Sequence, residues 1–97
     1  MKAVQIKNPG KSSSLTIEET PTPEPDPNQI LVKIQATALN RADLLQRTGN
    51  YDPPKGTSDI LGLEMAGTVE KVGSAVTKWK PGDRVFGLLP GGGYAEY

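Results

Sequence analysis

Apolar and polar residues alternate over several short segments of this chain, and glycine or proline separates one segment from the next. Such alternation is typical of β-strands that are buried on one face. Residues 1–7 and Leu15–Glu19 show this pattern, and we expect Leu15 and Ile17 to face the interior. Between the two segments, Asn8-Pro9-Gly10 has the composition of a turn. The pattern therefore predicts a hairpin at the start of the chain.

The clearest alternation runs over residues 29–38. One face of this predicted strand carries only apolar residues: Ile30, Val32, Ile34, Ala36 and Ala38. The opposite face carries Lys33, Gln35 and Thr37. We therefore expect a strand that lies at the centre of its sheet.

Two more strands are predicted nearer the end of the chain, at residues 65–72 and 83–88. Pro81-Gly82 precedes the second strand and suits the two middle positions of a type II turn. Gly91–Gly93 then interrupts the alternation, and residues 94–97 have the pattern of another strand that is just beginning.

A single short helix is predicted after the strand at residues 29–38. Asn40 suits the N-cap position, and Asp43 three residues later suits the first helical turn. We expect Leu44 and Leu45 to pack inward and Gly49 to end the helix after about two turns.

The remaining segments have the composition of loops and connectors. Four prolines between residues 21 and 27 favour an extended surface connector over a docking motif. Residues 50–59 form a polar loop that carries Tyr51. Trp79 precedes the Pro81-Gly82 turn, and we expect it to fill space beneath that turn rather than to bind a ligand.

The frequency of turn residues indicates the fold class. With 11 glycines and 9 prolines in 97 residues, the chain favours a mainly β barrel or sandwich over a helical bundle. The length suits one domain. Because the last predicted strand begins at Tyr94 and the sequence stops at Tyr97, we expect the leading portion of a longer protein, whose later strands complete the sheet.

Charge and residue types exclude several classes of function. Lys and Arg number 11 and balance 11 acidic residues without forming a basic stripe, so nucleic acid is not an expected partner. The chain has no cysteine and no histidine, which excludes disulfides, thiolate nucleophiles, serine–histidine–aspartate triads and zinc sites built from those ligands. No apolar run reaches the ~18 residues of a membrane span, and no signal peptide is recognisable. We therefore expect a soluble, cytoplasmic protein without a membrane partner.

Three ordered motifs point to a known family: ALNRADLLQRTGNYDPP, ILGLEMAGTVEKVG and KPGDRVFGLLPGGGYAEY. Their order and spacing resemble the N-terminal GroES-like domain of the medium-chain dehydrogenase/reductase superfamily. The chain is most similar to the zinc-free quinone oxidoreductases, especially the tumour-suppressor-inducible branch. The resemblance implies a GroES-like irregular β-barrel with one short helix, truncated before its last strands and before a Rossmann domain that binds the cofactor.

The departures from the zinc-dependent relatives are informative. In those relatives the position of Asn40 is a cysteine and that of Leu63 is a histidine, and both bind the catalytic zinc. An amide and an isobutyl group cannot replace these ligands. We therefore expect no metal site.

The resemblance implies hydride transfer from NADPH to a quinone or an activated alkene such as an enone. It places Asn40 and Tyr51 in the catalytic site, with Asn40, Arg41 and Asp43 as cofactor contacts. Each of these residues also has a simpler explanation. Asn40 suits an N-cap, Asp43 favours the helix dipole, Arg41 suits an exposed charge, and Tyr51 could anchor the loop against neighbouring prolines. Glu64, beside these motifs, is either a satisfied buried acid or an exposed rim charge.

The cofactor fingerprint of a strand, a glycine-rich turn and a helix is missing, because no helix is predicted after Gly91–Gly93. We therefore expect NADPH to be bound mainly by the absent Rossmann domain, and the 97-residue chain alone to be inactive. The parent would be a homo-oligomer through that absent domain. The alternative is a stand-alone GroES-like binding module without catalysis.

Overall fold

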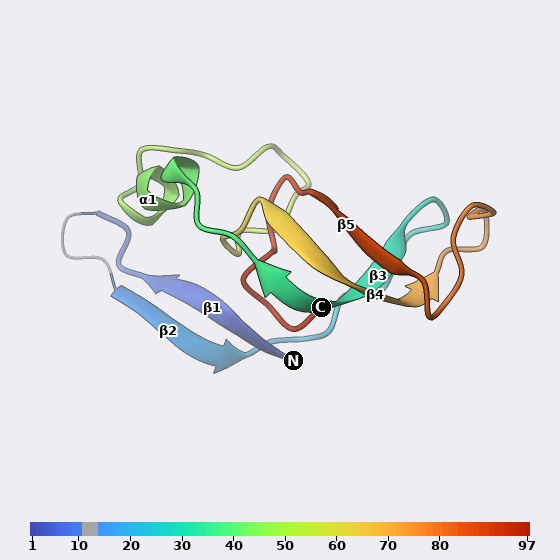
Figure 1. Ribbon diagram of the computed structural model, residues 1–97. Coiled ribbons are helices and arrows are strands. Elements are labelled where there is room, and N and C mark those ends of the chain that lie inside the picture. Colours follow the sequence, from blue (N-terminus) through green and yellow to red (C-terminus); the bar gives the residue numbers. More distant parts are fainter. Residues whose placement is uncertain (11–13) are drawn as a thin grey trace.

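The computed structural model describes residues 1–10 and 14–97, which form a mainly β structure with one short helix in the described part. Two antiparallel sheets lie side by side along the molecule (Figure 1). One contains β1 and β2, and the other contains β3, β4 and β5 in that spatial order. The strand bounds are β1 Lys2–Lys7, β2 Ser14–Glu19, β3 Ile30–Thr37, β4 Glu64–Val72 and β5 Arg84–Leu88. The predicted fold class is confirmed.

The opening hairpin is confirmed, but its apolar face is not the buried one. Val4 pairs with Ile17 and Ile6 pairs with Leu15 across the hairpin. Leu15 and Ile17 were expected to face the interior, yet they are 45% and 72% exposed. The buried residue of β1 is Ala3, which points to the opposite face and is bridged to Ala95. The face of β1 that is covered is therefore the one bridged to residue 95.

The segment at residues 94–97 joins the two sheets. The Val4 N–H donates to the Tyr94 carbonyl at 2.9 Å, and the Glu96 N–H donates to the Lys2 carbonyl at 3.1 Å. On the other side, the Ile34 N–H donates to the Glu96 carbonyl at 2.8 Å. Residues 94–97 thus form hydrogen bonds to β1 on one side and to β3 on the other, although the only β-pairing assigned to them among the described residues is the bridge between Ala95 and Ala3.

The prediction that residues 29–38 form the central strand is wrong. β3 is at one edge of its sheet, and β4 is central between β3 and β5. Register shifts between Leu31 and Val32 and between Ile34 and Ala36 break the alternation, so that adjacent Leu31 and Val32 are both buried. Gly67 of β4 allows β3 to approach closely, because a Cβ there would lie 2.1 Å from the Lys33 carbonyl oxygen.

Helix α1, Arg41–Arg47, follows Asn40 as predicted, and the Gly49 N–H donates to the Gln46 carbonyl just beyond its end. The expected inward packing of Leu44 and Leu45 is wrong, because they are 58% and 36% exposed. The buried residues of the helix are the polar Asp43 and Gln46. The Gln46 amide donates to the Asp59 carbonyl at 2.9 Å, so hydrogen bonds rather than apolar packing attach this face of the helix.

The Pro81-Gly82 turn has the predicted geometry. Gly82 has a φ of +96°, and the Asp83 N–H donates to the Lys80 carbonyl at 3.1 Å. Trp79 does not fill space beneath the turn, because it is 46% exposed. Its indole lines a surface groove together with Ile30 and Val76.

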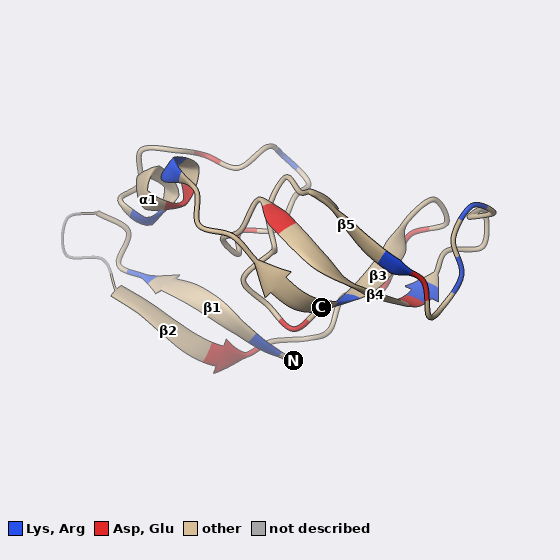
Figure 2. Ribbon diagram, in the orientation of Figure 1, with Lys and Arg blue, Asp and Glu red and all other residues tan. Residues whose placement is uncertain are grey.

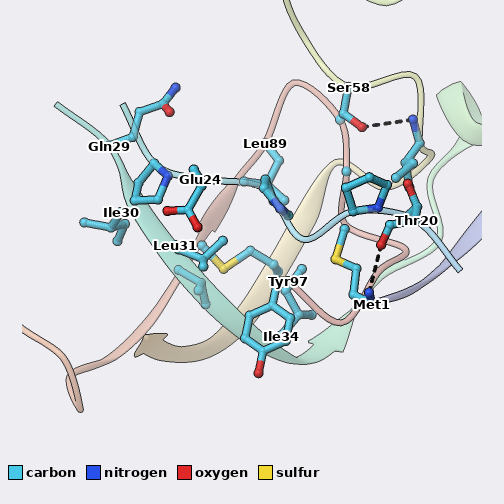
Figure 3. A pocket seen from close by; sticks show the side chains of 18 residues that line it. Met1, Thr20, Glu24, Gln29, Ile30, Leu31, Ile34, Ser58, Leu89 and Tyr97 are labelled. Carbon is cyan, nitrogen blue, oxygen red and sulfur yellow. Dashed lines mark hydrogen bonds between the residues drawn. The ribbon is translucent and has the colours of Figure 1, made fainter. Parts of the chain in front are cut away.

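A cavity of about 540 Å³ lies between the proline-rich segment, β3 and the end of the chain. Its lining includes Ile30, Leu31 and Ile34 of β3, together with Leu89 and Tyr97 (Figure 3). At one end the Met1 amino group donates to the Thr20 carbonyl at 2.8 Å. The cavity lining contains none of the site residues predicted from the sequence.

Candidate functional site

The candidate site lies where three segments distant in the sequence converge: the start of α1, the start of β4 and residues 93–94. Lys and Arg residues are interspersed with Asp and Glu along the ribbon, and α1 carries both signs of charge (Figure 2). Hydrogen bonds between specific groups hold these segments together.

Asn40 is held through its side chain by Glu64. Its backbone is extended, with φ −131° and ψ 156°, and the Nδ2 amide donates to Glu64 Oε2 at 2.8 Å. Glu64 is itself fixed, because its main-chain carbonyl accepts the Thr37 hydroxyl at 2.7 Å. One N–H of the Asn40 amide is thus committed to Glu64, and the other N–H can be offered to a ligand.

Glu64 fits neither of its two interpretations fully. It is half-buried, and its Oε2 accepts a hydrogen bond from the Asn40 amide, so it is neither a fully buried acid nor an exposed rim charge. It orients Asn40 from a position 24 residues later in the sequence. The residue itself was noted in the sequence, but its partner was not.

Asp43 is 5% exposed and closes the start of the helix. Its Oδ2 accepts the main-chain N–H of Asn40 at 2.8 Å and the hydroxyl of Tyr94 at 2.7 Å. The other oxygen, Oδ1, is buried without a hydrogen-bond partner among the described residues. The carboxylate therefore faces groups of its own chain, and its expected contact with a cofactor remains a prediction.

Tyr94 is the residue of this network that the sequence did not single out. Its burial, followed by the hydrogen bond to Asp43, raises the pKa of its phenol well above the usual value. The phenol is therefore protonated at neutral pH and donates to the carboxylate. The only local signal was its place directly after three glycines, which indicates a close approach of two backbones.

Gly62 and Gly93 make that approach possible. A Cβ on Gly62, which has a φ of +109°, would lie 2.6 Å from Gly93 Cα and 2.6 Å from the Tyr94 nitrogen. The Gly93 N–H donates to the Gly62 carbonyl at 3.0 Å, and the Tyr94 N–H donates to the Leu61 carbonyl at 2.8 Å. The crossing of these two segments carries the Tyr94 side chain to α1.

The other two predicted site residues are less constrained. Arg41 is exposed at the first position of α1, where its guanidinium is free to meet a ligand or another domain. Tyr51 is half-buried in the loop after the helix, and among the described residues no hydrogen bond fixes its phenol. The structure thus joins Asn40 to Asp43, leaves Arg41 at the surface and forms no hydrogen bond between Tyr51 and Asn40.

The residues present do not fit a catalytic zinc. Neither cysteine nor histidine occurs in the sequence, and the described residues contain no group of three acidic side chains close enough to hold a metal ion. At the two positions that bind zinc in zinc-dependent relatives, Asn40 uses its amide to bond Glu64, and Leu63 has no donor atom in its side chain. Among the described helices, none is long and apolar enough to cross a membrane.

Known proteins resemble this chain throughout. Residues 26–97 match the family model of the alcohol dehydrogenase GroES-like domain. A quinone oxidoreductase from Lama guanicoe is 36% identical over 99 residues, which cover 100% of this chain and 30% of that protein. The quinone oxidoreductase of Pseudomonas syringae pv. Tomato DC3000 superposes with a TM-score of 0.84 at 38% identity, covering 98% of this chain and 29% of that one.

The Escherichia coli quinone oxidoreductase, solved in complex with NADPH, is also similar. It superposes with a TM-score of 0.71 at 39% identity and covers 88% of this chain and 26% of that one. The chain thus spans about 30% of the length of the curated relative from Lama guanicoe. From the match over residues 26–97, the chain belongs to the alcohol dehydrogenase GroES-like domain family, and the proteins similar to it include quinone oxidoreductases.

Proposed function

We propose that this chain is the N-terminal, substrate-side domain of a longer NADPH-dependent quinone or enone oxidoreductase that works without a metal. The 97-residue chain alone would be inactive, because a following Rossmann domain would bind most of the cofactor. The parent protein would be cytoplasmic and would form homo-oligomers through that following domain. The single observation that carries the proposal is the Asn40 amide, held by Glu64 in a chain similar over its whole length to quinone oxidoreductases.

Within this chain, the residues that could contact a cofactor lie at the start of α1. Asn40 has an amide N–H that is not used by Glu64 and could donate to the carboxamide of a nicotinamide or to a substrate carbonyl. Arg41, exposed beside it, could pair with a cofactor phosphate. The nicotinamide, when bound, would supply the hydride. NADPH is chosen because the similar Escherichia coli protein was solved with it.

Tyr51 would stabilise the charge that develops on the substrate oxygen. A quinone or enone carbonyl becomes more negative as it accepts hydride, and a phenol O–H directed at that oxygen stabilises the transition state more than the ground state. In the described structure the phenol is not committed to another hydrogen bond, so it is available as such a donor. Its ring could also stack on a planar quinone.

The substrate oxygen would be polarised by hydrogen bonds and not by zinc. The positions of Asn40 and Leu63 lack ligand atoms of the kind that zinc requires, and Asn40 is already oriented by Glu64. The chain would therefore contribute donors and positioning, while the following domain would contribute most of the cofactor site.

Steady-state oxidation of NADPH by the full-length protein tests the proposal. We expect NADPH consumption that depends on added 1,4-benzoquinone or an enone and survives exhaustive treatment with a zinc chelator. The same assay with NADH measures the cofactor preference. A full-length protein that binds neither nucleotide and consumes no NADPH with either acceptor would contradict the proposal and would favour a binding module without catalysis.

A further inference from the structure

A chain of three hydrogen bonds runs from Tyr94 to Glu64 through the start of α1. The Tyr94 hydroxyl donates to Asp43 Oδ2 at 2.7 Å, and the same oxygen accepts the Asn40 N–H at 2.8 Å. The Asn40 side chain then donates to Glu64 at 2.8 Å. Asn40 is thus held at two atoms, its main-chain nitrogen by Asp43 and its amide nitrogen by Glu64.

We propose that Tyr94 is a positioning residue whose hydroxyl acts through Asp43 to fix the Asn40 amide in the orientation that the reaction needs. This inference rests on the proposed function, because it assigns Tyr94 a role in the same site. Tyr94 itself need not touch the substrate or the cofactor.

The helix depends on such an anchor because it is short. α1 has 7 residues, and helices of this length are marginal without tertiary contacts. Its two leucines are exposed and contribute little packing. The Gly10 N–H donates to the Arg47 carbonyl at its end, and two side-chain bonds also attach it, the Gln46 bond to the Asp59 carbonyl and the Asp43 bond to Tyr94. Of the two side-chain bonds, the first lies toward the end of the helix. The second lies at its start, where Asn40 is the N-cap.

Tyr94 is well placed to anchor another element, because its own backbone is fixed on both sides. Its N–H donates to the Leu61 carbonyl at 2.8 Å, and its carbonyl accepts the Val4 N–H at 2.9 Å. Residue 93, just before it, packs against Gly62. The raised pKa of the phenol keeps the hydroxyl proton in place over the usual assay range.

Removal of this hydroxyl has a definite structural consequence. Asp43 is only 5% exposed, and its carboxylate accepts two hydrogen bonds, one of them from the Tyr94 hydroxyl. Without that hydroxyl it would keep only the bond from the Asn40 N–H, while Oδ1 already has no partner among the described residues. The carboxylate would then be free to turn toward other donors or toward water. Since the Asn40 N–H depends on the same Oδ2, the start of the helix would lose its fixed orientation.

A double-mutant cycle in the full-length protein separates positioning from a purely structural role. We expect Tyr94→Phe to lower kcat for quinone reduction about 3- to 30-fold, with a smaller change in the KM for quinone. In the Asn40→Ala background, Tyr94→Phe should lower kcat by less than about twofold, because the residue through which it acts is gone. Full additivity of the two changes, or an unchanged kcat in Tyr94→Phe, would overturn the inference.

Tyr97→Phe is the matched control. It removes a tyrosine hydroxyl three residues away, on the lining of the cavity in Figure 3, and should leave kcat unchanged. Should Tyr94→Phe fail to fold, Asp43→Asn replaces it in the same cycle, because a neutral amide oxygen keeps the shape of the acceptor and weakens both accepted bonds.

Hydrogen exchange of the Asn40 N–H gives a readout that does not depend on turnover. Tyr94→Phe should speed exchange of this proton in the full-length protein by about tenfold or more relative to Tyr97→Phe. If the parent protein reduces no quinone, the proposed function fails, and this exchange rate still decides whether Tyr94 orders Asn40. An exchange rate equal to that of the control would overturn the inference.

Discussion

Asn40 combines two roles that can be separated by measurement. It begins α1, and its amide is presented by Glu64 at the site. We expect Asn40→Ala in the full-length protein to cost about 1 kcal/mol of stability through loss of the N-cap residue. If the amide also meets substrate or cofactor, the same change lowers kcat or raises the KM for NADPH. Asn50→Ala, which removes an exposed amide bonded to Thr48, is the control for both measurements.

Tyr51 is tested by removal of its hydroxyl alone. If the phenol donates to the substrate oxygen, Tyr51→Phe in the full-length protein should lower kcat by roughly 10- to 1,000-fold, because the loss of a comparable oxyanion donor costs ~10²–10³. The melting temperature should barely change. Were Tyr51 only a loop anchor, the phenylalanine ring would preserve its packing and turnover would stay within about twofold, while Tyr51→Ala would lower the melting temperature.

The sequence predicted most residues of the candidate site but not the long-range contacts between them. Asn40 and Asp43 are three residues apart, so their relation as N-cap and first-turn acid is local and could be predicted. The bonds from Asn40 to Glu64 and from Asp43 to Tyr94 span 24 and 51 residues. Such contacts depend on how strands and loops return to α1, and neither residue spacing nor composition contains that information.

Among the elements, the crossing of the segments at Gly62 and Gly93 controls where Tyr94 lies. Gly62→Ala would place a Cβ 2.6 Å from Gly93 Cα at a φ of +109°. We expect about 2–4 kcal/mol of destabilisation, since steric overlap is added to backbone strain. Gly87→Ala in β5 is the matched control, because a Cβ there meets nothing within 4 Å. Melting temperatures of the two variants compare them directly, and similar values would contradict this account of the crossing.

The turn before β5 should depend on pH. The side chain of Lys80, hydrogen-bonded at 3.0 Å, lowers the pKa of Asp83 below its usual 3.8, and the Lys80 main-chain N–H adds to this effect. The Asp83 carboxylate then binds a proton more readily in the unfolded chain than in the folded chain. It therefore stabilises the fold above pH 3.8, and this stabilisation is lost as the pH falls below 3.8. Melting temperatures should therefore show Asp83→Asn less stable than the parent at pH 7 and 5.

The same difference should shrink at pH 3 and below. The exposed Glu70, substituted by Gln, provides a control for general effects of acid. A difference between Asp83→Asn and the parent that stays constant from pH 7 to pH 2 would show that the carboxylate charge does not stabilise the turn.

The strands show which features of the fold could be predicted from neighbouring residues alone. The hairpin β1–β2 and the Pro81-Gly82 turn were predicted correctly, because alternation and turn residues act over a few positions. The centrality of β3 and the burial of Leu15 and Ile17 were predicted wrongly. The alternation in a strand shows which of its faces is apolar. Which face is covered depends on segments far along the chain, as the bridge between Ala3 and Ala95 illustrates.

Over the whole molecule, several large apolar side chains are exposed. Leu39, Phe86 and Leu88 are 85%, 87% and 85% exposed, in a chain that spans 30% of the length of the relative from Lama guanicoe. The hydrophobic core of the described residues is correspondingly small and consists of Ala3, Leu31, Val32, Leu61 and Val69. The described part of the chain also lacks a glycine-rich turn that leads from a strand into a helix, the feature that holds a dinucleotide pyrophosphate.

We therefore expect the 97-residue chain alone neither to bind NADPH at submillimolar concentrations nor to reduce quinones. Asn40 and Arg41 can supply only a few contacts, and without a phosphate-binding turn these contacts cannot offset the entropy lost on binding. Titration of NADPH fluorescence with the chain, beside the full-length protein at equal concentration, measures this difference. Saturable micromolar binding by the chain would place the cofactor site within residues 1–97, and quinone reduction by the chain would show that no second domain is needed. Weak or absent binding by the chain, with tight binding by the full-length protein, would assign the dinucleotide site to the portion that follows.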